Sequence, residues 1–252
     1  MTTQIRGPAG CLTLLVLLVA HGLGGEPAAE RPMLIVPAPG PVVIDGDLGD
    51  WNRAGKIGPV FFDEEAREEY NGTFYAMYDR EHLFLAARIV EPHPPYNTFP
   101  FKGFGDWNGD AVAIRMSSNP ARPFPVAMPD AATSPELFTA SFWWNHLRKD
   151  TFWAGYHGMH GETLRKEQMP GVRAAVRIAV GGKGYTMEVQ VPWTLVNPRF
   201  HPRPGDRIAF TWEVSISNAS PAQPARIFQL FANGGGASAF RDPHGWGAAV
   251  FK

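Results

Sequence analysis

Cysteine is almost missing from this sequence, since Cys11 is the only one among 252 residues. It lies in an apolar stretch near the amino terminus, so a chain without that stretch has no disulfide, no thiolate metal site and no cysteine nucleophile. Cys11 also stands at the beginning of the apolar run and not at its end, which argues against a lipoprotein attachment site.

An excess of charge of one sign is also missing, because 23 Lys and Arg balance 24 Asp and Glu. This balance gives no electrostatic basis for binding nucleic acid or an anionic membrane surface. Long hydrophobic runs are absent too. The apolar run at residues 11–20 is too short to cross a hydrocarbon core of about 30 Å as a helix, so no membrane span is predicted.

The amino-terminal segment has the pattern of a secretory signal peptide. Arg6 supplies a basic start, residues 11–20 form the apolar region, and small residues follow. We therefore predict a signal peptide and leader at residues 1–28, with cleavage around residues 25–29, and a secreted or periplasmic protein. A buried amino-terminal core helix is the alternative, which the basic start and the following Gly and Pro disfavour.

Helical periodicity is scarce, and 27 Gly and 24 Pro are typical of a turn-rich all-β protein. Apolar residues recur at every second position, the pattern of a half-buried strand. The clearest case is residues 206–217, where Ile208, Phe210, Trp212, Val214 and Ile216 alternate with Thr211, Glu213 and Ser215. Strands are expected at residues 33–36, 41–44, 72–78, 82–90, 110–116, 136–144, 151–156, 172–180, 185–191, 206–217 and 247–251.

About ten short strands separated by turns predict a β-sandwich of two packed antiparallel sheets, jelly-roll or immunoglobulin-like. No internal repeat and no long linker divides the chain, so one domain is expected at residues 33–252. Enzyme activity is not expected, because the sequence has no nucleophile elbow, phosphate-binding loop, dinucleotide fingerprint or zincin helix.

Several motifs follow one another in a recognisable order. They are IDGDLGDW at residues 44–51, GDWNGDAV at 105–112, GYTMEVQVPW at 184–193, PGDRIAF at 204–210 and FRDPHGWG at 240–247. In this order the chain resembles family 9 carbohydrate-binding modules and their DOMON-like relatives over residues 33–252. The resemblance implies an exported β-sandwich that binds a saccharide or polysaccharide without catalysis, in association with secreted glycan-degrading enzymes.

The resemblance also implies a binding site. In sugar-binding members two aromatic rings clamp a terminal sugar, because sugar C–H faces are apolar and each buried hydroxyl needs a polar partner. Trp107 matches the first ring and Phe240 stands where the second is expected. Asp110 matches the acid after the first ring, and Asn108 and Arg241 are the neighbouring polar residues.

Two positions depart from the family pattern. Ala113 stands where the family has a hydroxyl-binding glutamate, and residues 139–144 lack the family's strand arginine. The stacking half of the site is therefore expected to persist while the polar half is lost or rebuilt. Trp143 and Trp144 must face opposite sides of a strand, so one of them is a second aromatic platform, for which Trp144 is our candidate.

The aspartates of the first motif have two interpretations. Asp45 and Asp47 could bind calcium, which prefers hard oxygen ligands. Hydrogen bonds of Asx turns around Gly46 and Gly49 are the simpler interpretation, and the one we favour.

Haem b binding is the alternative function, since related DOMON-like domains hold haem through Met and His or Lys ligands. The candidate ligands are Met116, Met128, His146 and Lys149. Covalent haem is excluded because the sequence has no Cys-x-x-Cys-His motif. A cell-surface scaffold domain without a small ligand is the third possibility.

Overall fold

The computed structural model describes residues 32–99, 109–220, 226–234, 236 and 239–252. The predicted signal peptide lies outside these residues. Within the described part of the chain, no helix has the length and apolar character needed to cross a membrane.

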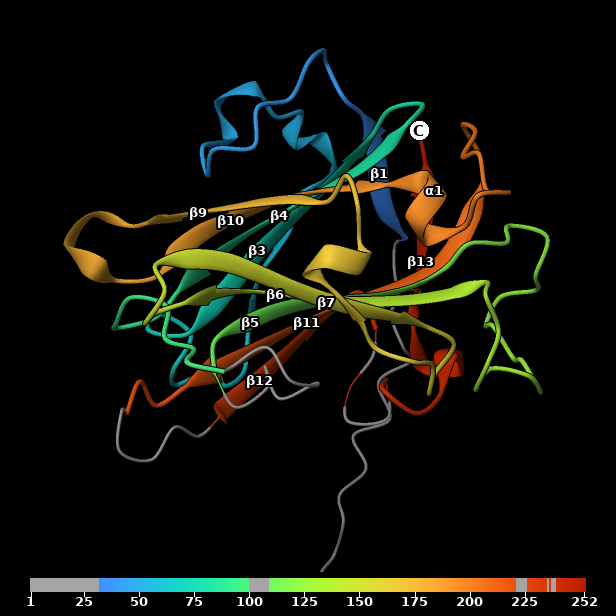
Figure 1. The fold of residues 1–252 in the computed structure, drawn as a ribbon. Coiled ribbons are helices and arrows are strands. Elements are labelled where there is room, and N and C mark those ends of the chain that lie inside the picture. Colours follow the sequence, from blue (N-terminus) through green and yellow to red (C-terminus); the bar gives the residue numbers. More distant parts are fainter. Residues whose placement is uncertain (1–31, 100–108, 221–225, 235, 237–238) are drawn as a thin grey trace, which may run out of the picture. The chain divides into compact units, whose positions relative to one another are not determined.

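Nearly all regular structure in the described residues is β-strand, which confirms the all-β prediction (Figure 1). The strands are β1 (Met33–Pro37), β2 (Ile57–Phe61), β3 (Asn71–Tyr78), β4 (His82–Val90), β5 (Ala111–Ser117), β6 (Leu137–Asn145), β7 (Asp150–His157), β8 (Leu164–Arg165), β9 (Arg173–Ile178), β10 (Tyr185–Pro192), β11 (Arg207–Ser217), β12 (Arg226–Ala232) and β13 (Gly247–Phe251). The helical pieces are α1 (Trp193–Val196) and the 3₁₀ turns η1 (Leu48–Asp50), η2 (Arg53–Gly55), η4 (Lys166–Gln168), η5 (Val180–Gly182) and η6 (Pro243–Gly245).

The prediction of two separate antiparallel sheets is wrong. The strands form one sheet in the order β8-β7-β6-β5-β11-β13-β1-β3-β4-β10-β9, with β12 paired to β11 and β2 to β3. β1 joins the two halves because it pairs in parallel with both β13 and β3. The sheet is therefore mixed and continuous. We call one side of β1 the first arm; it consists of β8, β7, β6, β5, β11 and β13, with β12. The other side is the second arm; it consists of β3, β4, β10 and β9, with β2.

The sheet is strongly curled, so that its two arms face each other across the main hydrophobic core (Figure 1). Phe74 of the second arm packs on Trp212 of the first, with ring centroids 5.1 Å apart. The two outer edges also touch, since the Thr151 hydroxyl on β7 donates to the carbonyl of Ala174 on β9 at 2.9 Å. The two arms of one curled sheet thus pack on each other as the two sheets of a sandwich would.

Most predicted strands form, but not all. Residues 41–44 are not a strand, because the Val43 amide is taken by the Asp50 carboxylate at 2.8 Å and so the segment follows a loop. β2, β8 and β12 were not predicted. β2 contains Gly58 and Pro59, which disguise it as a turn.

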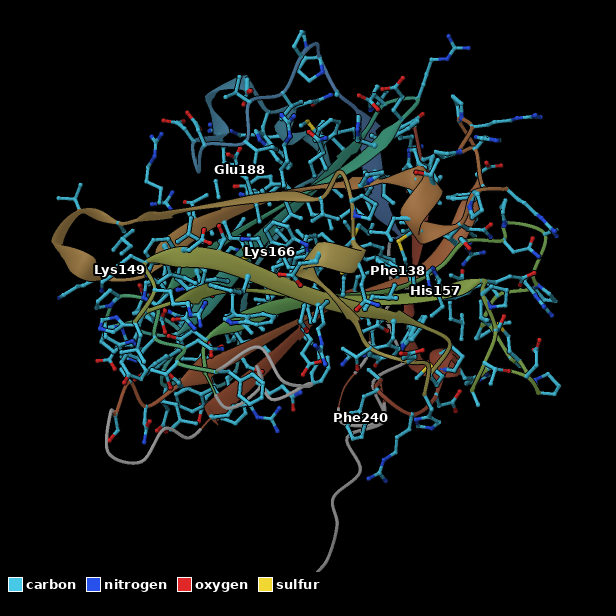
Figure 2. All side chains as sticks on the ribbon, viewed as in Figure 1. Phe138, Lys149, His157, Lys166, Glu188 and Phe240 are labelled. Atoms are coloured by element: carbon cyan, nitrogen blue, oxygen red, sulfur yellow. The ribbon has the colours of Figure 1, made fainter. Side chains whose placement is uncertain are left out.

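Glu188 of β10, which Figure 2 labels, anchors the first motif, residues 44–51, to the second arm. This side chain points from β10 to the face away from the core and is fully buried. Its carboxylate accepts hydrogen bonds from the backbone amides of Asp45, at 2.8 Å, and Gly46, and from the indole of Trp51. Gly46 has a φ of 86°, and a side chain there would meet Arg177. The Asp-Gly and Trp positions of the motif are therefore explained by packing on β10.

Replacement of Glu188 by alanine should lower the free energy of unfolding by about 3 kcal/mol, because three donors lose their acceptor. Glu188→Gln retains one carbonyl oxygen and should lose about half as much. Urea unfolding measures both. Gln190→Ala, on the same face of β10, is the control and should cost less than about 1 kcal/mol; equal losses at both positions would contradict the role of Glu188.

Candidate functional site

The first arm has one face that packs on the core and an opposite face that carries polar side chains. On β11, Phe210, Trp212 and Val214 point into the core, while Glu213 and Ser215 point to the opposite side. β5 repeats the pattern, with Val112, Ile114 and Met116 in the core and Ala111, Ala113 and Arg115 on the other side. We call this opposite side the pocket face.

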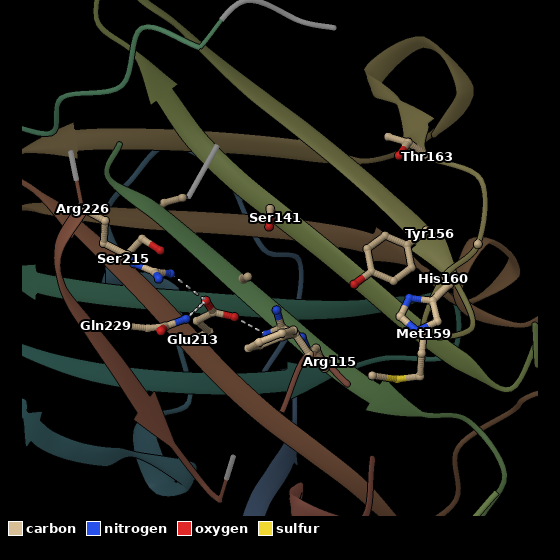
Figure 3. Close-up of a pocket in the computed structure, with 14 residues that line it drawn as sticks. Arg115, Ser141, Tyr156, Met159, His160, Thr163, Glu213, Ser215, Arg226 and Gln229 are labelled. Atoms are coloured by element: carbon tan, nitrogen blue, oxygen red, sulfur yellow. Dashed lines mark hydrogen bonds and ion pairs between the residues drawn. The ribbon is translucent and has the colours of Figure 1, made fainter. Parts of the chain in front are cut away.

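A cavity of about 540 Å³ lies on the pocket face (Figure 3). This volume falls within the range of small-ligand sites. Small side chains on β5, β6 and β11 form its floor and leave the space open, and residues of β7, β12 and two loops form its walls. The lining residues are Ala111, Ala113, Arg115, Ser141, Tyr156, Met159, His160, Gly161, Thr163, Glu213, Ser215, Arg226, Gln229 and Phe240.

A charged network crosses the cavity wall (Figure 3). Arg115 and Glu213 form an ion pair in which each side chain is only 8% exposed. The Gln229 amide donates to the Glu213 carboxylate, and the Arg226 guanidinium lies 3.9 Å from the same carboxylate. Among the described residues, Nε of Arg115 has no hydrogen-bond partner. The cavity therefore presents fixed donors and acceptors close to apolar surface.

The sequence comparison predicted that the polar half of the sugar site is lost or rebuilt, and Glu213 and Arg115 are relevant to that prediction. Glu213 is the cross-strand partner of Ala113, the position where the family glutamate is missing. Arg115 lies two residues beyond Ala113 on the same face of β5. A glutamate and an arginine are thus present on the pocket face, although both come from positions that the motif comparison did not select. A charged residue in the middle of an otherwise apolar strand was the signal that could have identified them.

The predicted aromatic clamp is described in part. Phe240 lines the cavity and is 38% exposed. The Arg241 guanidinium lies 5.0 Å from the centroid of the Phe240 ring, a cation–π contact. Trp107 and Asn108 lie outside the described residues. The chain re-enters the described part at Gly109, two residues before Ala111 of the cavity floor.

Three of the predicted sugar-site residues do not line the cavity, namely Asp110, Trp144 and Arg241. Asp110 is buried, and its carboxylate accepts the backbone amides of Tyr96 and Ser217, the latter at 2.6 Å. It therefore holds loop segments together. Trp144 is half-buried at the end of β6, while Trp143 is buried beside Phe152 on the other face of that strand.

The aspartates considered for calcium pair with protein groups. Asp47 accepts the Gly49 amide at 2.9 Å and Asp45 accepts the Asp47 amide at 2.8 Å, as in Asx turns. The Arg177 guanidinium also forms ion pairs with both carboxylates. Turn formation and the arginine thus account for both side chains.

The candidate methionine ligands do not converge with the candidate ligands His146 and Lys149. Met116 lies opposite Phe138 near the start of β6, and His146 follows the end of that strand. Eight residues of strand separate the two positions by roughly 25 Å. Met128 belongs to a separate apolar cluster and Lys149 is exposed in the β6–β7 turn. None of the four lines the cavity.

The Arg115–Glu213 pair should show strong energetic coupling. Arg115→Ala and Glu213→Ala should each lower the free energy of unfolding by about 3 kcal/mol, because each leaves one buried charge unpaired. The double variant should lose clearly less than the sum. Chemical denaturation of the four proteins gives the coupling free energy, and strict additivity would show that the two charges do not interact.

Comparison with known proteins gives a structural match only. No protein-family profile matches the sequence, and no curated protein matches it either. A family 9 carbohydrate-binding module from Caldicellulosiruptor kristjanssonii in complex with cellotriose matches with a TM-score of 0.60 and 16% identity, over 88% of this chain and 94% of the module. A structure of a family 9 module from the same organism in complex with glucose matches with a TM-score of 0.59 and 17% identity, over 87% and 95%. The chain therefore has the fold of a family 9 carbohydrate-binding module.

Proposed function

We propose that this protein binds a saccharide, without catalysis, in the cavity of the pocket face. The observation that carries the proposal is the pairing of aromatic and polar groups there. Phe240 and Tyr156 offer apolar ring surface to sugar C–H groups. Glu213, Arg115 and Gln229 offer the acceptors and donors that sugar hydroxyls require.

The structural neighbours support this proposal, because the matching modules were crystallised with cellotriose and with glucose. Glucose and cello-oligosaccharides are therefore the first ligands to test, by isothermal titration calorimetry. Heat that fits one site per chain supports the proposal.

We further propose that the protein is exported, on the basis of the signal-peptide pattern of residues 1–28, and that it acts beside secreted glycan-degrading enzymes.

Phe240→Ala should weaken sugar binding by about 1–3 kcal/mol, because a stacking ring is removed from the cavity wall. The titration is repeated with Phe61→Ala as the matched control. Phe61 is 39% exposed, close to the 38% of Phe240, but it lies on β2 and does not line the cavity. Affinity that falls equally in both variants would remove Phe240 from the site.

Trp107→Ala should weaken binding by a similar amount, about 1–3 kcal/mol, if its ring is the first clamp surface. This assignment rests on the sequence resemblance alone. An affinity gel containing soluble polysaccharide measures the effect as a loss of retardation, with Trp51→Phe as a control for loss of an indole elsewhere in the chain. Unchanged retardation of Trp107→Ala would overturn the assignment.

A further inference from the structure

A buried cluster of titratable groups lies outside the cavity, at the ends of four strands. Glu91 directly follows β4 and Asp110 directly precedes β5, and they are 1% and 2% exposed. His93 lies beside them, next to the last residue of β11, Ser217, and Tyr185 begins β10 nearby. Two carboxyl groups are thus brought together in an interior that disfavours negative charge.

The two carboxyl groups differ in how they are satisfied. Asp110 accepts two backbone amides, from Tyr96 and Ser217. Glu91 has no hydrogen-bond partner on either oxygen among the described residues, although its side chain is completely buried. An unpartnered carboxylate in such a place costs several kcal/mol unless a cation or a proton compensates it.

His93 is oriented toward the unpartnered carboxylate. Its Nε2 lies 3.1 Å from the carbonyl of Ser217, to which an N–H at that position donates. Its Nδ1 lies 3.6 Å from Oε2 of Glu91, and also 3.1 Å from the carbonyl of Pro94. A metal-binding histidine commonly donates its other ring N–H to a backbone carbonyl, and the contact of Nε2 with Ser217 meets that requirement.

One donor atom from each of Glu91, His93 and Asp110 lies within 4.8 Å of the others. Two donors that bind one zinc ion in tetrahedral geometry are about 3.3 Å apart, so the 3.6 Å between His93 and Glu91 is close to that spacing. The three groups come from two loop ends that β4 and β5 hold in place.

We propose that Glu91, His93 and Asp110 form a site for a divalent transition-metal ion of the zinc type. One imidazole nitrogen and two carboxylate oxygens are a donor set that such ions accept in catalytic and structural sites. Calcium is a poorer fit, because it takes six to eight oxygen ligands. The ion would neutralise the acid pair and tie the segment after β4 to the residue that precedes β5.

The electrostatics of the cluster agree with a missing positive charge. Burial, together with the neighbouring Asp110 carboxylate, raises the pKa of Glu91 to about 10. Burial also raises the pKa of Asp110, and the same two carboxylates add to the burial that raises the pKa of Tyr185. A divalent cation would offset the carboxylate repulsion that adds to burial in raising the pKa values of Glu91 and Tyr185.

The test begins with the full protein freed of metal by EDTA and dialysed. Zinc, manganese and calcium chlorides are then titrated separately by isothermal titration calorimetry, and the melting temperature is followed. Zinc should bind with one ion per chain and raise the melting temperature, while calcium should not. Absence of stoichiometric zinc binding overturns the proposal, and the acid pair is then compensated by protons on the carboxyl groups.

Glu91→Gln and His93→Gln locate the ion. Both keep the size of a polar side chain, and the first removes a buried charge, so folding should persist and is checked by circular dichroism. Loss of a residue that only hydrogen-bonds to a metal ligand weakens metal binding by roughly 10–100-fold. Each of these variants loses a ligand and should weaken zinc binding by more than that. The control is His82→Gln, whose Nδ1 lies 3.5 Å from the Asp79 carboxylate in a more exposed pair without a third ligand. Zinc binding lost only in the control would place the ion elsewhere and refute the site.

Discussion

The alternation of side chains along β5 and β11 is the constraint on which both the core and the pocket depend. Successive residues of a strand point to opposite faces. The same strand therefore supplies Trp212 to the core and Glu213 to the pocket face. A shift of register by one residue would bury the Arg115–Glu213 pair in the core and expose the core aromatics. Core packing thus fixes the geometry of the polar network.

This constraint explains how much of the fold could be predicted. The alternation in residues 206–217 predicts β11 and its inward side, because a half-buried strand needs no information beyond its own sequence. The place of β1 could not be predicted in this way. Its five residues contain no sign that they pair in parallel with two strands from opposite ends of the chain. Pairing partners, unlike strand formation, are set by long-range packing.

The residues of the candidate site also differ in whether local sequence or long-range packing determines their place. Phe240 was selected as a clamp residue through the FRDP motif, and the structure shows that it lines the cavity. Glu213 and Arg115 could not be selected in this way, since their partnership depends on the register between β5 and β11, which are distant in sequence. Asp110 shows the opposite case. Its place in the motif suggested contact with a sugar, yet it does not line the cavity, and its carboxylate accepts the amides of Tyr96 and Ser217.

The position of β1 has a consequence for how the polypeptide acquires its structure. β1 is made first among the strands and β13 last, yet they are direct neighbours in the sheet. The amide of Lys252 also donates to the carbonyl of Ile35. Such non-local pairing is slow to form, so the sheet can close only after synthesis of the whole segment from β1 to β13. Until β13 is made, the edge of β1 that pairs with it stays open, which is a period of vulnerability to aggregation for the nascent chain.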